Sequence, residues 1–150
     1  MKFEQQSNPK EYASNFQKVV TNILLTSSWL SKKQSDVLKK FDLTLQQFNI
    51  LKILRGLNGE SATIKFLTEK MIDKMSNTSR LVDKLLAKEL VRREECQNDR
   101  RRVDIFITEK GRNLLLQASE ILDALFRDAN MSLSVEQILI LSNLLEKIRQ

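Results

Sequence analysis

Apolar residues recur at intervals of three and four positions along most of the chain, which is the pattern of amphipathic helices. The first such stretch runs from Glu11 to Lys33 and predicts a helix of about twenty residues, longer than a small domain needs. A second helix is expected to begin at Thr44, because Thr44 and Gln47 can form a capping box. Gly56 and Gly59 can end this helix by adopting turn or left-handed conformations.

Two further helices are expected with only a short turn between them. The first is expected from about Thr63 to Met71, and the second from Asp73 or Ser76 to Lys88. The second helix has an apolar set at helical spacing, formed by Met75, Leu81, Val82 and Leu85. Two helices joined so closely indicate a helix-turn-helix.

The pattern then changes from a helical period to alternation. Val103, Ile105 and Ile107 occupy every second position, which is typical of a strand, and residues 90–95 can pair with this strand as the other arm of a hairpin. Residues 96–102 would form the connecting loop. A helix-turn-helix followed by a hairpin predicts a mainly α fold with a small β-hairpin wing, that is, a winged helix-turn-helix.

Two long helices are expected after the hairpin. Thr108 can cap the first, and Ser134 with Gln137 can form a capping box for the second. The last helix is nearly apolar all round, since its apolar positions are Ile138, Leu139, Ile140, Leu141, Leu144, Leu145 and Ile148. Such a helix can be buried within one molecule or between two subunits, and we favour the second arrangement. We therefore predict a single domain, 1–150, with a dimerisation region of residues 8–40 and 112–150 and a winged lobe of residues 41–111.

Composition and charge narrow the class of partner. The chain has 150 residues, 41% of them hydrophobic, which is enough for one core. The net charge is +6, and residues 74–112 hold eleven basic and seven acidic side chains, whereas residues 113–150 hold three and five. A basic lobe favours a polyanion, although a charged segment can also be a solvated face. Because no signal peptide or run of 18 apolar residues is present, we expect a cytoplasmic protein without membrane contact.

The second helix of the helix-turn-helix carries the candidate DNA contacts. In this fold it can enter the major groove, where base edges present a pattern of donors and acceptors that identifies each base pair. Polar and basic side chains able to reach bases and phosphates crowd this helix: Lys74, Ser76, Asn77, Thr78, Ser79, Arg80 and Lys84. The alternative is that the Ser and Thr residues only cap the helix. We predict double-stranded DNA as the partner.

Three consecutive arginines, Arg100, Arg101 and Arg102, mark the tip of the wing. Guanidinium groups suit the minor groove, whose narrow A·T-rich stretches have an enhanced negative potential. Asp99 precedes them, and its carboxylate can pair with an arginine and brace the tip. Plain charge balancing on a solvated turn is the alternative, and we favour the brace.

Four segments follow one another in the order Arg80-Leu81-Val82-Asp83-Lys84-Leu85, Leu90-Val91, Asn98-Asp99-Arg100-Arg101-Arg102 and Thr108-Glu109-Lys110-Gly111. Their order and spacing resemble the MarR family of bacterial regulators from about Leu67 to Gly111, and the long flanking helices are similar to that family's dimerisation helices. The resemblance implies a homodimeric transcription regulator, which we expect to be a repressor, on a pseudopalindromic operator. It implies that Ser76 to Arg80 read the major groove and that Arg101 enters the minor groove. It also implies a small aromatic or phenolic effector.

The sequence departs from that family's pattern at two turns. Members commonly have Gly before and after the recognition helix, where this chain has Ile72 and Glu89. A residue other than Gly in a left-handed conformation costs roughly 1–2 kcal/mol. We therefore expect these two turns to be shaped differently from those of the family, which affects where the recognition helix begins.

Other functional classes have less support. The chain has no His, one Cys and no glycine-rich phosphate loop, so we predict that it is not an enzyme and that it has no cofactor or metal site. The stronger alternative is a winged-helix module that binds proteins instead of DNA. Three adjacent arginines would fit that alternative only if the partner were acidic.

Overall fold

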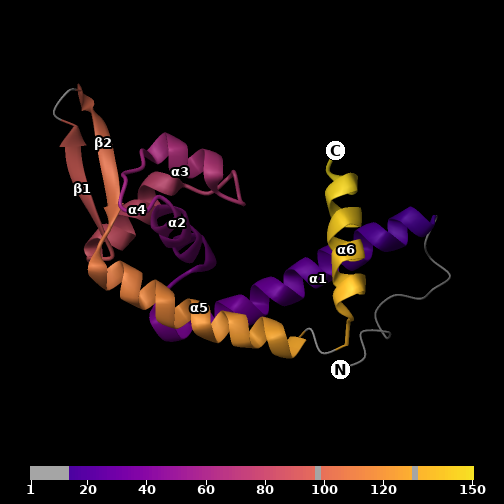
Figure 1. Cartoon of the computed structure of the whole chain (residues 1–150). Helices are drawn as coiled ribbons and strands as arrows, with labels where there is room; N and C mark the ends of the chain where they lie inside the picture. The colour runs from indigo at the N-terminus through magenta and orange to yellow at the C-terminus, as the bar shows by residue number, and fades with distance from the viewer. Residues whose placement is uncertain (1–13, 97–98, 130–131) are drawn as a thin grey trace.

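The computed structural model describes residues 14–96, 99–129 and 132–150, and the side chains of residues 96, 99–102 and 128–129 lie outside this description. Predictions for residues 8–13 and for Asn98 therefore lie outside the described residues. The elements in chain order are α1 (Asn15–Leu38), the 3-10 turn η2 (Lys39–Phe41), α2 (Leu45–Gly56), α3 (Ile64–Lys70), α4 (Thr78–Ala87), β1 (Val91–Cys96), β2 (Asp99–Ile107), α5 (Glu109–Ala129) and α6 (Val135–Ile148) (Figure 1).

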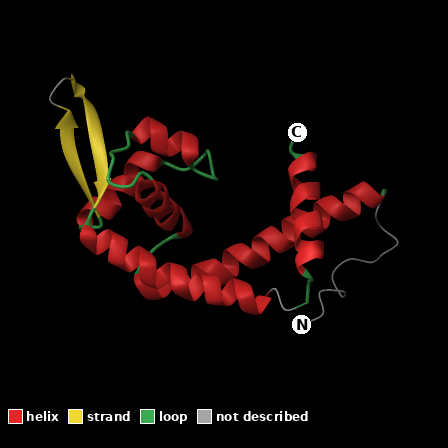
Figure 2. Ribbon diagram, in the orientation of Figure 1, coloured by secondary structure: helices red, strands yellow, loops and turns green. Residues whose placement is uncertain are grey.

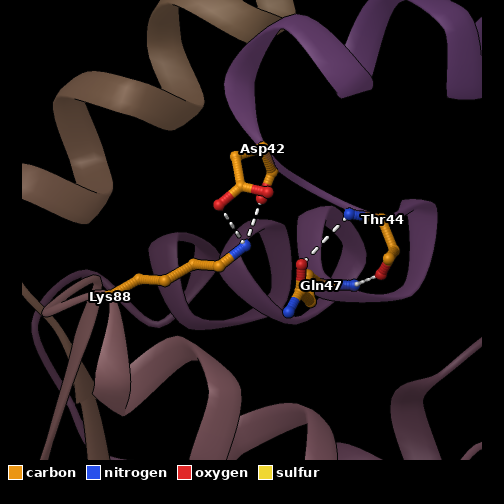
Figure 3. A network of polar contacts seen from close by, with 4 residues as sticks. All are labelled: Asp42, Thr44, Gln47 and Lys88. Atoms are coloured by element: carbon orange, nitrogen blue, oxygen red, sulfur yellow. Dashed lines mark hydrogen bonds and ion pairs between the residues drawn. The ribbon is translucent and has the colours of Figure 1, made fainter.

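The predicted fold class is confirmed, since the described chain consists of helices and one two-stranded antiparallel sheet (Figure 2). The two predicted capping boxes are also confirmed. The backbone N–H groups of Gln47 and Gln137 donate to the hydroxyl oxygens of Thr44 and Ser134, at 3.2 Å in both cases. Each glutamine side-chain oxygen in turn accepts a bond from the backbone N–H of its cap residue. Figure 3 shows the pair formed by Thr44 and Gln47. Local sequence therefore determines where these helices begin.

The first helix ends later than its apolar pattern predicts. It begins at Asn15, one residue after the cap Ser14, and ends at Leu38, whereas the sequence predicts residues 11–33. No Gly or Pro interrupts this stretch, and Leu38 is fully buried, so packing carries the helix one more turn. The chain then turns at Asp42, whose φ of 52° is left-handed.

The core lies between α2, α4, the hairpin and the first half of α5. Its fully buried members include Leu51, Leu67, Leu85, Ile105 and Leu115, which come from five different elements. α1 contributes only one buried residue and α6 contributes none. The core therefore belongs to the lobe and to the helix that leaves it.

The hairpin is longer and its loop shorter than the sequence predicts. Val91 pairs with Ile107 and Cys96 pairs with Asp99, so the backbone of Asp99, Arg100, Arg101 and Arg102 lies in β2 and only residues 97–98 separate the strands. The prediction of a loop over residues 96–102 is therefore wrong. The pairing is regular from Val91–Ile107 to Glu95–Val103, and a register shift between Glu95 and Cys96 then places Arg100, Arg101 and Arg102 between the last two pairs. Pairing between strands depends on contacts that local sequence does not indicate.

Candidate nucleic-acid interface

The candidate recognition helix, α4, begins later than expected. Asn77 is its N-cap, and its side-chain oxygen accepts a bond from the Arg80 backbone N–H at 3.1 Å. Lys74 and Ser76, predicted to lie on this helix, lie instead in the turn before it. Both residues are close to the start of the helix in sequence, but their side chains are not spaced as residues of the helix are.

The turn before α4 is organised by Asp73. Its carboxylate accepts a bond from the Met75 backbone N–H at 3.0 Å and another from the Ser76 hydroxyl at 3.1 Å. Short polar side chains compete with helix formation in this way, since they bind nearby backbone groups in a turn. The helix therefore starts at Thr78, and Met75, which the pattern assigned to the apolar face of the helix, is 93% exposed.

Thr78 differs from the other polar residues predicted to contact DNA. It is only 4% exposed, and Thr68 of α3 donates a hydroxyl bond to it at 2.8 Å. This bond joins the two helices of the helix-turn-helix. The Thr78 side chain therefore bonds within the fold. This agrees better with the alternative that Ser and Thr residues here have a structural role than with a contact to DNA.

The outward face of α4 is polar. Val82 and Leu85 are buried on the opposite face, whereas Ser79, Arg80 and Lys84 are exposed. Asn77 is exposed at the helix start. Four of the seven residues predicted on the recognition helix thus share one accessible region, and their contacts with DNA stay a prediction.

The wing is attached to the helix-turn-helix at two points. Arg93 of β1 donates to the Asp83 carboxylate of α4 at 2.9 Å. Ala62, just before α3, exchanges two backbone bonds of 2.9 Å with Ile105 of β2. Both side chains of the Arg93–Asp83 pair are well exposed, so this pair contributes little to stability. The base of the hairpin also packs into the core through Val91, Ile105 and Ile107.

The wing arginines are placed only by their backbone. Arg100, Arg101 and Arg102 lie in β2 next to the hairpin turn, and their side chains, with that of Asp99, lie outside the described part of the chain. The brace between Asp99 and an arginine stays a prediction. Nearer the base of the hairpin, the Arg92 guanidinium lies 4.1 Å from the centroid of the Phe106 ring on the facing strand.

The turn between α4 and β1 keeps a left-handed residue although it has no glycine. Glu89 has a φ of 60°, and the bonds from Glu89 N to Leu86 O and from Leu90 N to Leu85 O complete a Schellman motif. The Glu89 side chain accepts a bond from Lys110 at 2.8 Å, and this bond and the lysine charge lower the pKa of the carboxyl group. Ile72, at the other departure, has no positive φ. The turn after α4 therefore keeps a left-handed residue although glycine is missing, whereas position 72 does not adopt this conformation.

Lys88 fixes the other end of α4 against the start of α2. Its ammonium group lies 3.0 Å from the Asp42 carboxylate and also donates to the Asp42 carbonyl (Figure 3). Asp42 lies two residues before Thr44, the N-cap of α2, so the pair joins the end of α4 to the segment that leads into α2. The sequence reasoning missed both this pair and the Arg93–Asp83 pair, because each joins residues that are distant or on different kinds of element.

The described residues offer neither a metal site nor a membrane span. They contain no group of three or more His, Cys, Asp or Glu side chains placed to hold a metal ion. None of their helices is both long enough and apolar enough to cross a membrane. This part of the chain does present a polar face on α4 and, on α1, α5 and α6, exposed apolar side chains.

Comparison with known proteins agrees with this geometry. The MarR family profile matches residues 43–103. The chain is similar to the transcriptional regulator SarZ of Staphylococcus aureus, with 30% identity over 108 residues that cover 72% of each chain. It is also similar to SarZ of Staphylococcus haemolyticus, with 31% identity over 110 residues that cover 73% of this chain and 74% of the relative.

Solved structures share the fold. The organohalide-sensing regulator RdhR-CbdbA1625, in its form bound to 2,4-dichlorophenol, superposes with a TM-score of 0.84 and 23% identity over 99% of this chain and 88% of that one. The transcriptional regulator BldR of Sulfolobus solfataricus gives a TM-score of 0.69 and 31% identity over 87% of this chain and 94% of that one. The likeness therefore extends beyond the lobe to the flanking helices.

Proposed function

The chain belongs to the MarR family of winged helix-turn-helix transcription regulators, and from this premise we propose that it acts as a homodimeric repressor on a pseudopalindromic DNA operator. The observation that carries the proposal is the attachment of the wing to α4 through Arg93 and Asp83, which leaves the polar face of α4 exposed beside the hairpin. α4 would enter the major groove and the wing would follow the adjacent minor groove. This activity needs no catalytic group.

A dimer is supported by the apolar surfaces outside the lobe. α6 has no buried residue, and it exposes Leu139, Ile140, Leu141 and Leu144. α1 and α5 also expose large apolar side chains, including Phe16, Leu24 and Leu116. Such surfaces are unfavourable in water, so burial against a second copy would stabilise them. On this proposal residues 8–40 and 112–150 form the dimer and residues 41–111 form the DNA-binding lobe.

The test of DNA binding is the substitution Arg101→Ala. Removing a guanidinium group from the minor groove should weaken operator binding by about tenfold or more, since a bond to a charged group contributes roughly 1.5–3 kcal/mol. Titration of a labelled operator with each variant, followed by fluorescence anisotropy, measures this change. Arg149→Ala, which removes the same charge just after α6, is the matched control and should leave the affinity unchanged. Equal affinities for all three proteins would remove the wing from the proposed interface.

We also propose that a small aromatic or phenolic ligand releases the operator. The support is the similarity to a regulator whose structure contains 2,4-dichlorophenol. A ligand would act by favouring one spacing of the two recognition helices in the dimer. In the same anisotropy assay, 2,4-dichlorophenol is the first ligand to add, and a lower operator affinity at saturating ligand is expected. If neither this compound nor related phenols changed the affinity, the proposed effector would be wrong.

A further inference from the structure

Two large apolar side chains are exposed on the winged lobe. Ile72 is 85% exposed and Met75 is 93% exposed, and both lie between α3 and α4. The other exposed large apolar side chains of the described residues all lie on α1, on α5, or between Leu133 and the end of α6. Ile72 and Met75 are therefore separate from the surfaces assigned to the dimer.

The turn holds Met75 in a defined position. Its backbone N–H donates to the Asp73 carboxylate at 3.0 Å, and the Ser76 backbone N–H donates to the Asp73 carbonyl at 3.3 Å. The following residue, Asn77, caps α4. The side chain of Met75 thus leaves the backbone from a hydrogen-bonded turn directly before the recognition helix.

The surroundings of Met75 favour a polyanion over an apolar protein partner. Lys74, whose ammonium group donates to the Glu69 carbonyl, precedes it, and Arg80 lies in the first turn of α4; both are exposed. The one carboxylate of the turn, that of Asp73, already accepts two bonds from within the turn. A duplex can satisfy the cations with its phosphates and also offer an apolar group, because thymine carries a C5-methyl group in the major groove.

We propose that Met75 contacts the C5-methyl group of a thymine in each half-site of the operator, and so helps to determine sequence preference. This inference rests on the proposed function, since it needs α4 in the major groove. Met has a flexible and polarizable side chain, so it can adapt to a methyl group presented at the groove floor. Burying the two apolar groups against each other removes both from water.

The experiment compares thymine with 2′-deoxyuridine, which lacks only that methyl group. Each thymine of a selected operator is replaced, in both half-sites together, and the affinity of the wild type and of Met75→Ala is measured. At one position the wild type should lose about fourfold per half-site, the effect of about one buried methyl group. Met75→Ala should bind the thymine operator more weakly and should show no loss on replacement at that position.

Two control variants test whether an apolar side chain at position 75, and not the one at position 72, gives the preference for thymine. Met75→Leu keeps an apolar side chain and should keep the preference for thymine, whereas Ile72→Ala removes the neighbouring exposed apolar group and should keep it as well. Because Met75 is so exposed, its replacement should leave Tm unchanged. The inference would be overturned if the wild type bound the operator tightly and no replacement of thymine by 2′-deoxyuridine lowered its affinity. It would also be overturned if the replacement lowered the affinity of Met75→Ala as much as that of the wild type. Either result would leave the proposed function standing. Absence of any bound operator would overturn both.

Discussion

At the junction of α4, β1 and α5, packing supports a backbone conformation that the local sequence does not favour. Glu89 adopts a left-handed conformation at a position where the resemblance to the MarR family implies glycine. The sequence shows that glycine is missing there, but not that the conformation persists. The Thr108 hydroxyl donates to the Glu89 carbonyl at 2.7 Å and Lys110 binds the Glu89 side chain, so α5 supports the strained turn from outside it.

Gly111 allows the close approach of α5 to this turn. A Cβ at this position would lie 2.1 Å from the carbonyl oxygen of Leu90, which is a backbone atom that cannot move alone. Gly111→Ala should therefore lower the free energy of unfolding by about 1–3 kcal/mol, the usual cost of overpacking. Urea denaturation at one fixed protein concentration measures this, since the stability of a dimer depends on concentration.

Gly56→Ala is the matched control for that substitution. A Cβ at Gly56 would meet nothing within 4 Å, and Gly56 is the last residue of α2. Alanine there should raise the free energy of unfolding by about 0.5–1 kcal/mol, because glycine is the poorer helix former. If Gly111→Ala unfolded at the same urea concentration as the wild type, the close approach of α5 to Leu90 would be wrong.

Residues at the start of α4 show the limit of pattern reasoning. Met75 fits the apolar spacing of a helix that begins at Asp73, and Thr78 fits its polar face. The structure reverses their environments, because Asp73 forms a turn and moves the helix start to Thr78. The position of the helix N-cap therefore changes which side chains are exposed at the start of α4.

At the scale of elements, the sequence predicts type and order better than length. α2, α3 and α6 begin where Thr44, Thr63 and Ser134 predict, because each cap bond is made within four residues. The predicted end of α1 and the predicted bounds of the hairpin loop are wrong by several residues. Both depend on partners far along the chain, namely the core around Leu38 and the pairing of β1 with β2.

Contacts between elements are the part of the site that sequence reasoning could not provide. The Arg93–Asp83 pair joins the wing to α4, and the Lys88–Asp42 pair joins the end of α4 to the segment before α2. Charged residues are frequent in this chain, and nothing in their spacing identifies which of them meet. The polar face of α4 could be predicted because its composition is local, whereas its position relative to the wing could not.

At the scale of the whole molecule, two kinds of surface are separated. The lobe carries the polar face of α4 and the hairpin, whereas α6 and the outer parts of α1 and α5 carry exposed apolar side chains. Figure 1 shows α6 and the beginning of α1 on the opposite side of the molecule from the hairpin. The segment from residue 113 to residue 150 has more acidic than basic residues, so it is poorly suited to phosphates. This separation is what a dimer needs in order to present two recognition helices to one duplex.

The most direct test of this account is selection of duplexes from a random pool at several salt concentrations, followed by sequencing of the bound fraction. A homodimer should recover a pseudopalindrome with half-site centres about one helical turn apart, and its affinity should fall steeply with salt as counterions are released. A variant with Leu139→Glu and Leu144→Glu in α6 should lose the two-fold pattern, because it places charges on the proposed dimer surface. Recovery of no shared sequence, with binding insensitive to salt, would contradict the account and favour a protein-binding role for the lobe.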